Sequence, residues 1–324
     1  MPREIELKAN KDSEPCLPSL PRRNFLELAA GATVGSVLPA ASAIAADAPV
    51  PTRPIPRTGE RLPVVGLGTA IIFDIGEDAS KRAERTEVIK TMLSGGAKLI
   101  DTAPSYGTAE TVVGDLLAAT GLRDKVFLAT KVRVANRENS LAEMNQSLRR
   151  LRTDKVDLLQ LHNVEDVQTD LRVLQEWRDQ GRARYIGITH FRAGAYDRVA
   201  QVLKREKPEF LQLNYSLAER DAEQHLLPLA ADTGTAVLVN LPFGRGKLFS
   251  AVRGKTLPPW AAEFDATSWG QFFLKYLLAH PAVTCVIPGT DKPEYMVDNL
   301  GAARGRLPDA ALRRRMVEFW NSIA

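Results

Sequence analysis

Four side chains that can donate, accept or orient a proton lie at or just after the ends of successive short apolar segments. They are a carboxylate, a phenol, an ammonium group and an imidazole, at Asp101, Tyr106, Lys131 and His162 (the tetrad). Such groups act as general acids and bases when they lie together. Taken singly, each has a structural explanation, because aspartates cap helices, tyrosines pack, lysines are solvated and histidines are held in cores. Their succession at segment ends favours one common site.

The apolar segments themselves are predicted strands. Their content of Val, Ile, Leu and Thr, and their apolar character on both faces, are typical of strands buried in a parallel sheet. Between them, apolar residues recur about every 3.6 positions, which indicates helices. The predicted strands cover residues 64–69, 98–103, 126–132, 156–163, 185–190, 210–215, 236–242 and 283–290.

Capping residues indicate where some of the helices begin and end. Ser140, with Glu143 three residues later, is the predicted N-cap of one helix. Thr108 is the predicted N-cap of another, which we expect to end at Gly121. A last helix is predicted over residues 309–320.

Eight strand–helix units in about 280 residues are typical of a (β/α)8 TIM barrel. We therefore predict an α/β fold with a single barrel domain over residues 60–324. The alternative is a doubly wound sheet, which requires a G-x-G-x-x-G motif after the first strand. Gly66 and Gly68 stand there without the third glycine. Since barrel enzymes carry their active sites at the C-terminal ends of the strands, the tetrad is expected to converge there.

Composition excludes several classes of protein. Of 324 residues, 44% are hydrophobic and 25% charged, which is ordinary for a soluble globular chain and excludes a disordered, collagen-like or polytopic membrane protein. The 43 basic and 39 acidic residues are interspersed, and no basic block with aromatic residues points to nucleic acid. Cys16 and Cys285 allow at most one disulfide. His225, His280 and Cys285 lack the spacing of metal ligands, so we predict no metal.

The first 46 residues are interpreted as an export signal. Arg22 and Arg23 precede a weakly apolar Ala/Gly/Val run, and residues 43–45 offer an A-x-A cleavage site. Glu27 and Pro39 make the run a poor membrane span. The segment resembles a twin-arginine signal, which implies recognition by the twin-arginine export machinery and a periplasmic location reached in the folded state. A disordered tail is the alternative.

A linker is predicted between the signal and the barrel. Residues 47–59 contain the Pro-rich stretch APVPTRPIPRTG (48–59). Proline restricts its own backbone and that of the preceding residue to extended conformations. We therefore expect an extended connection there.

Three motifs around the tetrad resemble a known family. DTAPSYGTAE (101–110), LATKV (128–132) and LLQLHN (158–163) are similar to the Asp, Tyr, Lys and His segments of the aldo-keto reductases, in the same order and on the same strands. The likeness extends over roughly residues 60–304 through the segments GITHF (187–191), LQLNYSL (211–217), NLPFGRGKL (240–248) and VIPGTDKPEYMVDNL (286–300). It implies an oxidoreductase that reduces a small aldehyde or ketone, or runs the reverse reaction, with a nicotinamide cofactor.

The chemistry of carbonyl reduction suggests a role for each member of the tetrad. Hydride adds to carbon and a proton to oxygen, so the donor must hold its proton at working pH yet release it readily. Free tyrosine has a pKa of about 10, and a close ammonium favours its phenolate form. We therefore interpret Tyr106 as the general acid, Lys131 as the neighbouring cation and Asp101 as its counter-ion. His162 would orient the carbonyl oxygen by a hydrogen bond.

The family resemblance also implies a cofactor site. It assigns the nicotinamide carboxamide to Thr189, His190 and Gln212, the pyrophosphate to Leu241, Phe243 and Arg245, and the adenosine end to Gly289, Thr290 and Asn299. Two positions of the nicotinamide site depart from the family: His190 replaces a usual Asn, and Asn240 stands where a Tyr usually stacks on the nicotinamide. At the adenosine end, Gly289 and Tyr295 stand where NADPH-specific members carry basic residues. The resemblance favours NADPH, with NADH as the alternative.

Other functions stay open from the sequence. One is a non-catalytic barrel that binds a nucleotide and serves a protein partner. Another is an isomerase or lyase of phosphorylated sugars that needs no cofactor. Residues 70–77 and the loop through Trp260 are the segments expected to wall the substrate pocket.

Overall fold

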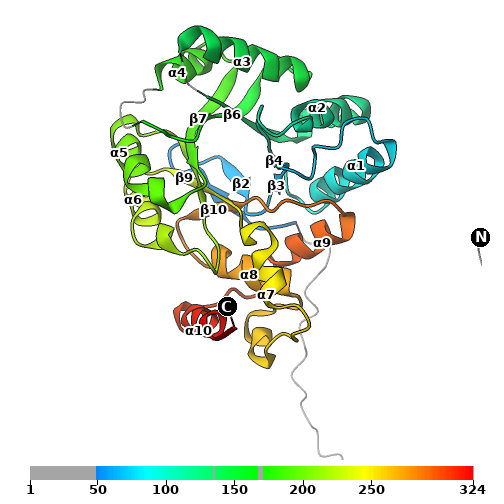
Figure 1. The fold of residues 1–324 in the computed structure, drawn as a ribbon, viewed down its shortest axis with the longest axis vertical. Coiled ribbons are helices and arrows are strands. Elements are labelled where there is room, and N and C mark those ends of the chain that lie inside the picture. The colour runs from blue at the N-terminus through cyan, green and yellow to red at the C-terminus, as the bar shows by residue number, and fades with distance from the viewer. Residues whose placement is uncertain (1–48, 134–135, 167–170, 324) are drawn as a thin grey trace, which may run out of the picture. The chain divides into compact units, whose positions relative to one another are not determined.

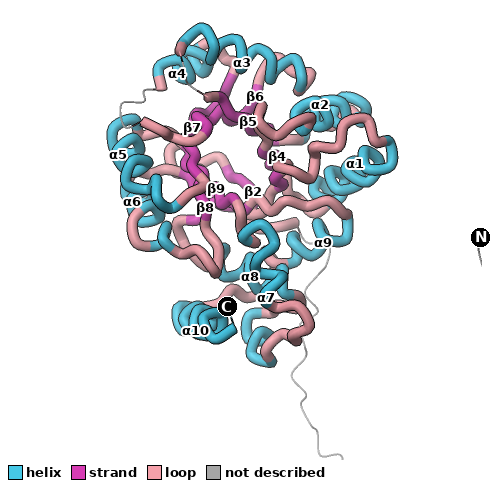
Figure 2. Tube along the Cα trace, viewed as in Figure 1, coloured by secondary structure: helices cyan, strands magenta, loops and turns pink. Residues whose placement is uncertain are grey.

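Eight parallel strands form one curved sheet in the computed structural model, which describes residues 49–133, 136–166 and 171–323. The strands are hydrogen-bonded in chain order (Figures 1 and 2). They are β3 (Leu67–Gly68), β4 (Leu99–Asp101), β5 (Phe127–Val132), β6 (Val156–His162), β7 (Ala183–His190), β8 (Phe210–Asn214), β9 (Ala236–Asn240) and β10 (Val283–Val286). All eight predicted strands are confirmed. The predicted signal, residues 1–46, lies outside the described residues.

The two edges of this sheet meet. Isolated parallel bridges join Val65 to Val286 and Gly68 to Gly289, and the Gly68 amide donates to the carbonyl oxygen of Pro288 at 3.1 Å. Gly68 permits this approach, because a Cβ there would lie 2.7 Å from the carbonyl oxygen of Ile287. The curled sheet and its closing bridges are consistent with the predicted (β/α)8 barrel.

Helices surround the strands (Figure 2). They are α1 (Ala79–Ser94), α2 (Ala109–Thr120), α3 (Arg137–Arg150), α4 (Arg172–Asp179), α5 (Tyr196–Glu206), α6 (Leu226–Asp232), α7 (Lys247–Ala251), α8 (Trp269–Leu278), α9 (Pro293–Gly301) and α10 (Ala310–Ile323). Among the helices of the described ranges, none combines the length and apolar character needed to span a bilayer.

The apolar residues pack in two clusters. The larger lies between the helices and the outer face of the sheet and includes Val88, Leu148 and Trp177. The smaller includes Leu99, Phe127 and further residues near the N-terminal ends of the strands. Inward side chains at that end fill the barrel with apolar groups, which leaves the opposite end for polar ones.

The segment predicted as a linker is part of the folded unit. Strand β1 (Thr52–Pro54) pairs antiparallel with β2 (Arg61–Pro63). Ile55 and Leu62 are fully buried in the smaller apolar cluster. The stretch is extended, as its prolines require, but Ile55 supplies an apolar anchor that a free linker would lack. The linker interpretation is therefore wrong for the described residues 49–59.

The predicted helix caps are partly wrong. Helix α3 begins at Arg137, and the side chain of Asn136 accepts from the Asn139 amide at 2.8 Å. Ser140 lies one turn later, where its hydroxyl donates to the Asn136 carbonyl oxygen at 2.8 Å. Asn136 is the N-cap because its backbone is extended and its short side chain accepts a hydrogen bond from an otherwise unpaired amide of the first turn. Thr108 does precede α2, which ends at the left-handed Gly121 as predicted, but its side chain makes no capping bond.

Candidate active site

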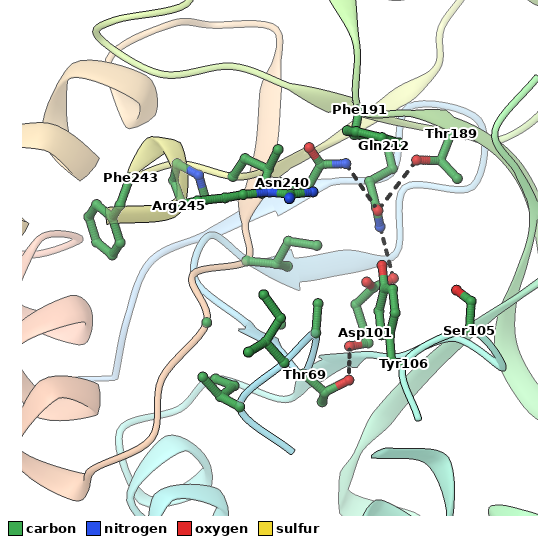
Figure 3. A pocket seen from close by; sticks show the side chains of 18 of the residues that line it. Thr69, Asp101, Ser105, Tyr106, Thr189, Phe191, Gln212, Asn240, Phe243 and Arg245 are labelled. Carbon is green, nitrogen blue, oxygen red and sulfur yellow. Dashed lines mark hydrogen bonds between the residues drawn. The ribbon is translucent and has the colours of Figure 1, made fainter. Parts of the chain in front are cut away.

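A cavity of about 710 Å³ opens at the C-terminal ends of the strands (Figure 3). Three members of the tetrad line it, each from a different strand end or loop: Asp101, Tyr106 and His162. Lys131 lies next to them, fully buried behind the cavity wall. The structure therefore brings the four predicted residues together.

Lys131 and Asp101 form a buried ion pair. The Lys131 Nζ donates to Asp101 Oδ2 at 2.6 Å and to the Thr102 carbonyl oxygen at 2.9 Å. Burial favours the neutral amine, but the carboxylate of Asp101 and the Tyr106 oxygen favour the ammonium, so the pKa of Lys131 is raised. The lysine is thus a permanent cation at neutral pH.

Tyr106 lies over this cation. The Lys131 Nζ is 4.8 Å from the centre of the Tyr106 ring. The loop that carries the tyrosine is anchored on both sides: the Tyr106 amide donates to Ala103 O at 3.1 Å, and the carboxylate of Asp74 accepts from both Thr108 N and Thr108 Oγ1. The phenol is therefore held between the cation and the cavity.

His162 is neutral at physiological pH. Burial first, and then the cations of Lys131 and Arg133, lower the pKa of His162 to about 3. Its ring meets that of Tyr106 edge-on, with centroids 6.0 Å apart, and its Nδ1 lies 3.5 Å from Ser105 Oγ. A neutral imidazole has one N–H to donate and adds no charge to the site.

Gln212 links the tetrad to the predicted cofactor site. Its Nε2 donates to Asp101 Oδ1 at 2.8 Å, and its Oε1 accepts from Thr189 Oγ1 at 3.4 Å and from Asn240 Nδ2 at 3.3 Å (Figure 3). Thr189, Gln212 and Asn240 all line the cavity. Thr189 and Gln212, which are predicted to bind the carboxamide, therefore both line the cavity.

His190 is not in the cavity, which corrects its predicted position. It follows the cavity-lining Thr189 in β7, and successive side chains of a strand face opposite sides. The His190 Nδ1 accepts from the Arg192 amide at 3.0 Å. Burial, then the cations of Arg198 and Arg192, lower the pKa of His190. Phe191, the next residue, lines the cavity instead.

The remaining predicted cofactor residues divide into two groups. Those that line the cavity are Leu241, Phe243, Arg245 and Gly289. Thr290 and Asn299 are buried behind it, where Asn299 Nδ2 donates to Thr290 Oγ1 at 2.9 Å. Thr290 Oγ1 in turn donates to the Pro288 carbonyl oxygen at 3.3 Å, and neither side chain lines the cavity, which corrects their predicted position.

Two groups in the cavity wall have unused bonding capacity. The Asn240 Oδ1 atom is buried and has no hydrogen-bond partner within the described ranges. Arg245 lies over the Phe191 ring, 5.6 Å from its centre, and no ion pair is found for it in the described part of the chain. A buried orphan acceptor and an unpaired cation are the features expected of a site for a polar, anionic ligand.

Several cavity residues have a left-handed backbone although they are not glycine. They are Ile71, Asn163, Leu241 and Arg245, with φ of 70°, 61°, 49° and 55°. For a β-branched residue such as Ile71 this conformation is a genuine outlier. Such strain is characteristic of functional sites, since the surrounding structure must hold it in place.

The sequence did not single out four residues that shape the site: Thr69, Ser105, Gln160 and Phe191. The sequence could have indicated Gln160, because it is a polar residue in an apolar strand, two positions before His162. Ile71, Ile72 and Asp74 of the predicted wall 70–77 do line the cavity. Trp260 does not, because it packs in an aromatic cluster with Phe264, Phe272 and Phe319. No group of three His, Cys, Asp or Glu side chains placed to hold a metal is found within the described ranges.

The chain is similar to known proteins over most of its length. The sequence model of the Aldo/keto reductase family matches residues 64–315. The chain is 34% identical over 223 residues to aldo-keto reductase YhdN of Bacillus subtilis, covering 64% of this chain and 65% of that protein. It is 31% identical over 232 residues to methylglyoxal reductase YeaE of Escherichia coli, covering 69% and 80%.

Two further matches bear on the cofactor. An NADH-specific methylglyoxal reductase of Escherichia coli is 26% identical over 324 residues, covering 82% of this chain and 98% of that protein. A crystal structure of an aldo-keto reductase from Klebsiella pneumoniae in complex with NADPH has a TM-score of 0.69 and 26% identity, covering 81% of this chain and 92% of that one.

The curled parallel sheet and the acid–base groups at its strand ends are those of a barrel enzyme. The chain belongs to the aldo/keto reductase family.

Proposed function

We propose that this protein reduces an aldehyde or ketone to the alcohol, or runs the reverse reaction, with NADPH as the first candidate cofactor and NADH as the alternative. The observation that carries the proposal is the buried Lys131–Asp101 pair beneath the ring of Tyr106, beside a neutral His162, at one cavity.

The residues present fit a nicotinamide dinucleotide. The orphan Asn240 Oδ1 can accept from a carboxamide NH₂, and Thr189 and Gln212 lie beside it. Arg245 lines the cavity and is the cation that could bind a pyrophosphate. Gly289 has no side chain, so the cofactor could approach the backbone closely there. When bound, the cofactor supplies the hydride that reduces the carbonyl carbon.

The protein's own residues handle the proton. Tyr106 donates its phenolic proton to the substrate oxygen as that oxygen gains charge. The ammonium of Lys131 stabilises the resulting phenolate, and the Asp101 carboxylate keeps the lysine charged and in place. His162 donates its N–H to the same oxygen and so orients the carbonyl toward Tyr106.

Substitution of the acid tests this assignment. Tyr106→Phe removes the proton and leaves the ring, so we expect carbonyl reduction to be abolished while cofactor binding, measured by quenching of nicotinamide fluorescence, stays nearly unchanged. Turnover of aldehydes by Tyr106→Phe at the rate of the unsubstituted protein would refute the role of Tyr106.

The cofactor preference needs its own measurement. Relatives in complex with NADPH and with NADH specificity both occur. The affinities of the two cofactors for the purified protein decide between them. Equal affinities would show that the site does not recognise the 2′-phosphate.

A non-catalytic barrel that binds a nucleotide for a protein partner is the second candidate. Asn240 favours it, because it offers no aromatic face to the nicotinamide. A panel of simple aldehydes separates the two functions: turnover supports the reductase, whereas tight nucleotide binding without turnover of any member supports the alternative.

We further propose that the protein is exported folded by the twin-arginine route and acts in the periplasm with a cofactor carried from the cytoplasm. The support is the sequence of residues 21–46 with its Arg22–Arg23 pair. Replacing both arginines with lysine should retain the protein in the cytoplasmic fraction. Exported protein should release nicotinamide nucleotide when denatured, and nucleotide-free exported protein would contradict the carriage of the cofactor.

A further inference from the structure

The two carboxylate oxygens of Asp101 have different partners. Oδ2 faces the Lys131 ammonium at 2.6 Å. Oδ1 accepts two amide hydrogens, from Gln160 Nε2 at 2.9 Å and from Gln212 Nε2 at 2.8 Å. Lys131 and Gln212 already have proposed roles in the reaction, but Gln160 has none.

Gln160 lies in the barrel wall rather than in the cavity. It is fully buried in β6, in register with Lys131 of β5 on one side and Gly187 of β7 on the other. Its side chain is absent from the cavity lining. Any effect that it has on the reaction must therefore pass through the groups it touches, Asp101 and Gln212.

Gly187 leaves room for this side chain. A Cβ at Gly187 would lie 3.2 Å from the Gln160 Cγ and 3.0 Å from the Phe210 Cβ. Contacts that short require a neighbour to move, and in a packed barrel a neighbour moves only at a cost. The glycine thus allows the Gln160 side chain to reach across toward Asp101.

The side-chain amide of Gln212 has partners in the protein and a proposed partner in the cofactor. In the structure its Nε2 donates to Asp101 Oδ1 and to Gln160 Oε1, the latter at 3.3 Å, which uses both amide hydrogens. Under the proposed function its carboxamide also contacts the nicotinamide, and a new donor bond there must replace one of these. Gln160 does not line the cavity, so we expect its bond to Asp101 to persist when a cofactor is bound.

We propose that Gln160 is a positioning residue, which holds the Asp101 carboxylate with Oδ2 directed at Lys131 while Gln212 exchanges between Asp101 and the cofactor. This inference rests on the proposed role of the tetrad. A charge-assisted hydrogen bond of this kind is stronger than a neutral one and fixes the orientation of the carboxylate. The orientation in turn sets how much of the lysine charge reaches Tyr106.

Gln160→Met tests the proposal, because methionine has a similar shape and no amide donor. We expect kcat for aldehyde reduction to fall by about tenfold or more while KM for the cofactor changes by less than about twofold. The alkaline limb of the pH–rate profile should move to higher pH, since a carboxylate with one amide dipole fewer offsets more of the lysine charge. Circular dichroism establishes that the variant is folded.

Gln160→Glu gives a second and independent readout. Two carboxylates at hydrogen-bond distance cannot both be ionised without strong repulsion, so they share a proton. The introduced carboxyl group, once protonated, would again be able to donate to Asp101. We therefore expect the activity of this variant, relative to the unsubstituted protein, to increase as the pH falls from about 8 to about 6.

Tyr185→Phe is the matched control. Tyr185, in β7, is also buried, and its hydroxyl donates to Glu60 at 2.6 Å and lies 3.2 Å from Thr58 Oγ1, but it belongs to the apolar cluster at the far end of the strands. Its kcat and pH profile should stay unchanged. If Gln160→Met keeps the original kcat and pH profile while Tyr106→Phe is inactive, the inference fails and the proposed function stands. An active Tyr106→Phe would instead remove the proposed function. Should Gln160→Met not fold, a Gln160→Glu activity that has no relative pH dependence overturns the inference.

Discussion

The ammonium nitrogen of Lys131 lies 4.8 Å from the centre of the Tyr106 ring. The lysine belongs to β5 and the tyrosine to the loop after β4, and these strands are neighbours in the sheet. The cation therefore contacts the phenol from inside the barrel, where Asp101 is its counter-ion and water has no access to it. In this arrangement a charge strong enough to affect a neighbouring phenol is held without exposure to solvent.

Removal of the buried cation should affect both stability and activity. Lys131→Met leaves the Asp101 carboxylate buried without its partner, which typically costs about 3–5 kcal/mol. We expect urea unfolding to show a loss of this order and aldehyde reduction to fall at least about hundredfold.

Lys275→Met is the control for this loss. Lys275 is also fully buried, and its Nζ donates to the carbonyl oxygens of Arg304 at 2.6 Å and Arg306 at 3.0 Å, away from the cavity. It should lose stability and keep its activity per folded molecule. Equal loss of activity in both variants would show that Lys131 acts only through the fold.

The low pKa of His162, about 3, predicts a pH dependence of stability. In the unfolded chain the imidazole takes up a proton as the pH falls below about 6.5, whereas in the folded protein it does not. The unfolded state then binds more protons, so stability decreases as the pH falls through this window. At pH 5 the effect of this one group is about 2 kcal/mol.

His162→Gln measures that contribution. The variant retains a hydrogen-bond donor but cannot be protonated in this range. The difference in unfolding free energy between pH 7 and pH 5 should be smaller in the variant by about 2 kcal/mol. An unchanged difference would mean that His162 takes up protons equally in the folded and the unfolded state.

Asp74 connects the cavity wall to the loop of Tyr106. Its carboxylate accepts from Thr108 N at 2.9 Å and from Thr108 Oγ1 at 2.8 Å, which lowers its pKa. Asp74→Ala should lower the midpoint of urea unfolding, as the loss of a cap does, and also lower kcat, because the tyrosine loop loses its anchor. Asp78 is a matched control, since it accepts from Lys81 N at 3.0 Å at the start of α1. Asp78→Ala should lose similar stability with kcat unchanged.

Asn240 stands where the family usually has Tyr, and the effect of this difference on cofactor affinity can be measured. Asn240→Tyr restores an aromatic side chain to the end of β9, and aromatic stacking contributes about 0.5–1.5 kcal/mol beyond burial. We expect cofactor affinity, followed by fluorescence quenching, to increase by about twofold to tenfold. Asn240→Leu, which adds apolar area without an aromatic ring, should not increase it. Weaker binding by the tyrosine variant would show that the hydrogen bond proposed for Asn240 Oδ1 contributes more to cofactor affinity than an aromatic stack would.

Local patterns were enough to predict most elements and the tetrad. The strands read as apolar runs because both faces of each are buried, and Asp101 and His162 stood out as polar exceptions within or at the end of such runs. The cap of α3 was misassigned because Ser140 and Asn136 are both suitable residues, and only the extended backbone of Asn136 decides between them. The hairpin of β1 and β2 escaped prediction because β1 lies within the proline-rich stretch 48–59, whose composition is typical of an extended linker.

The sequence by itself determined the alternation of strands and helices and the order of the chemical groups along them, because both depend on neighbouring residues. Only the tertiary structure decided which side chains share the cavity. Thr189 faces it and His190 does not, since adjacent strand residues point to opposite sides. The amides of Gln160 and Gln212, 52 positions apart, meet on one oxygen of Asp101 because the sheet curls until distant strands face one another across its interior.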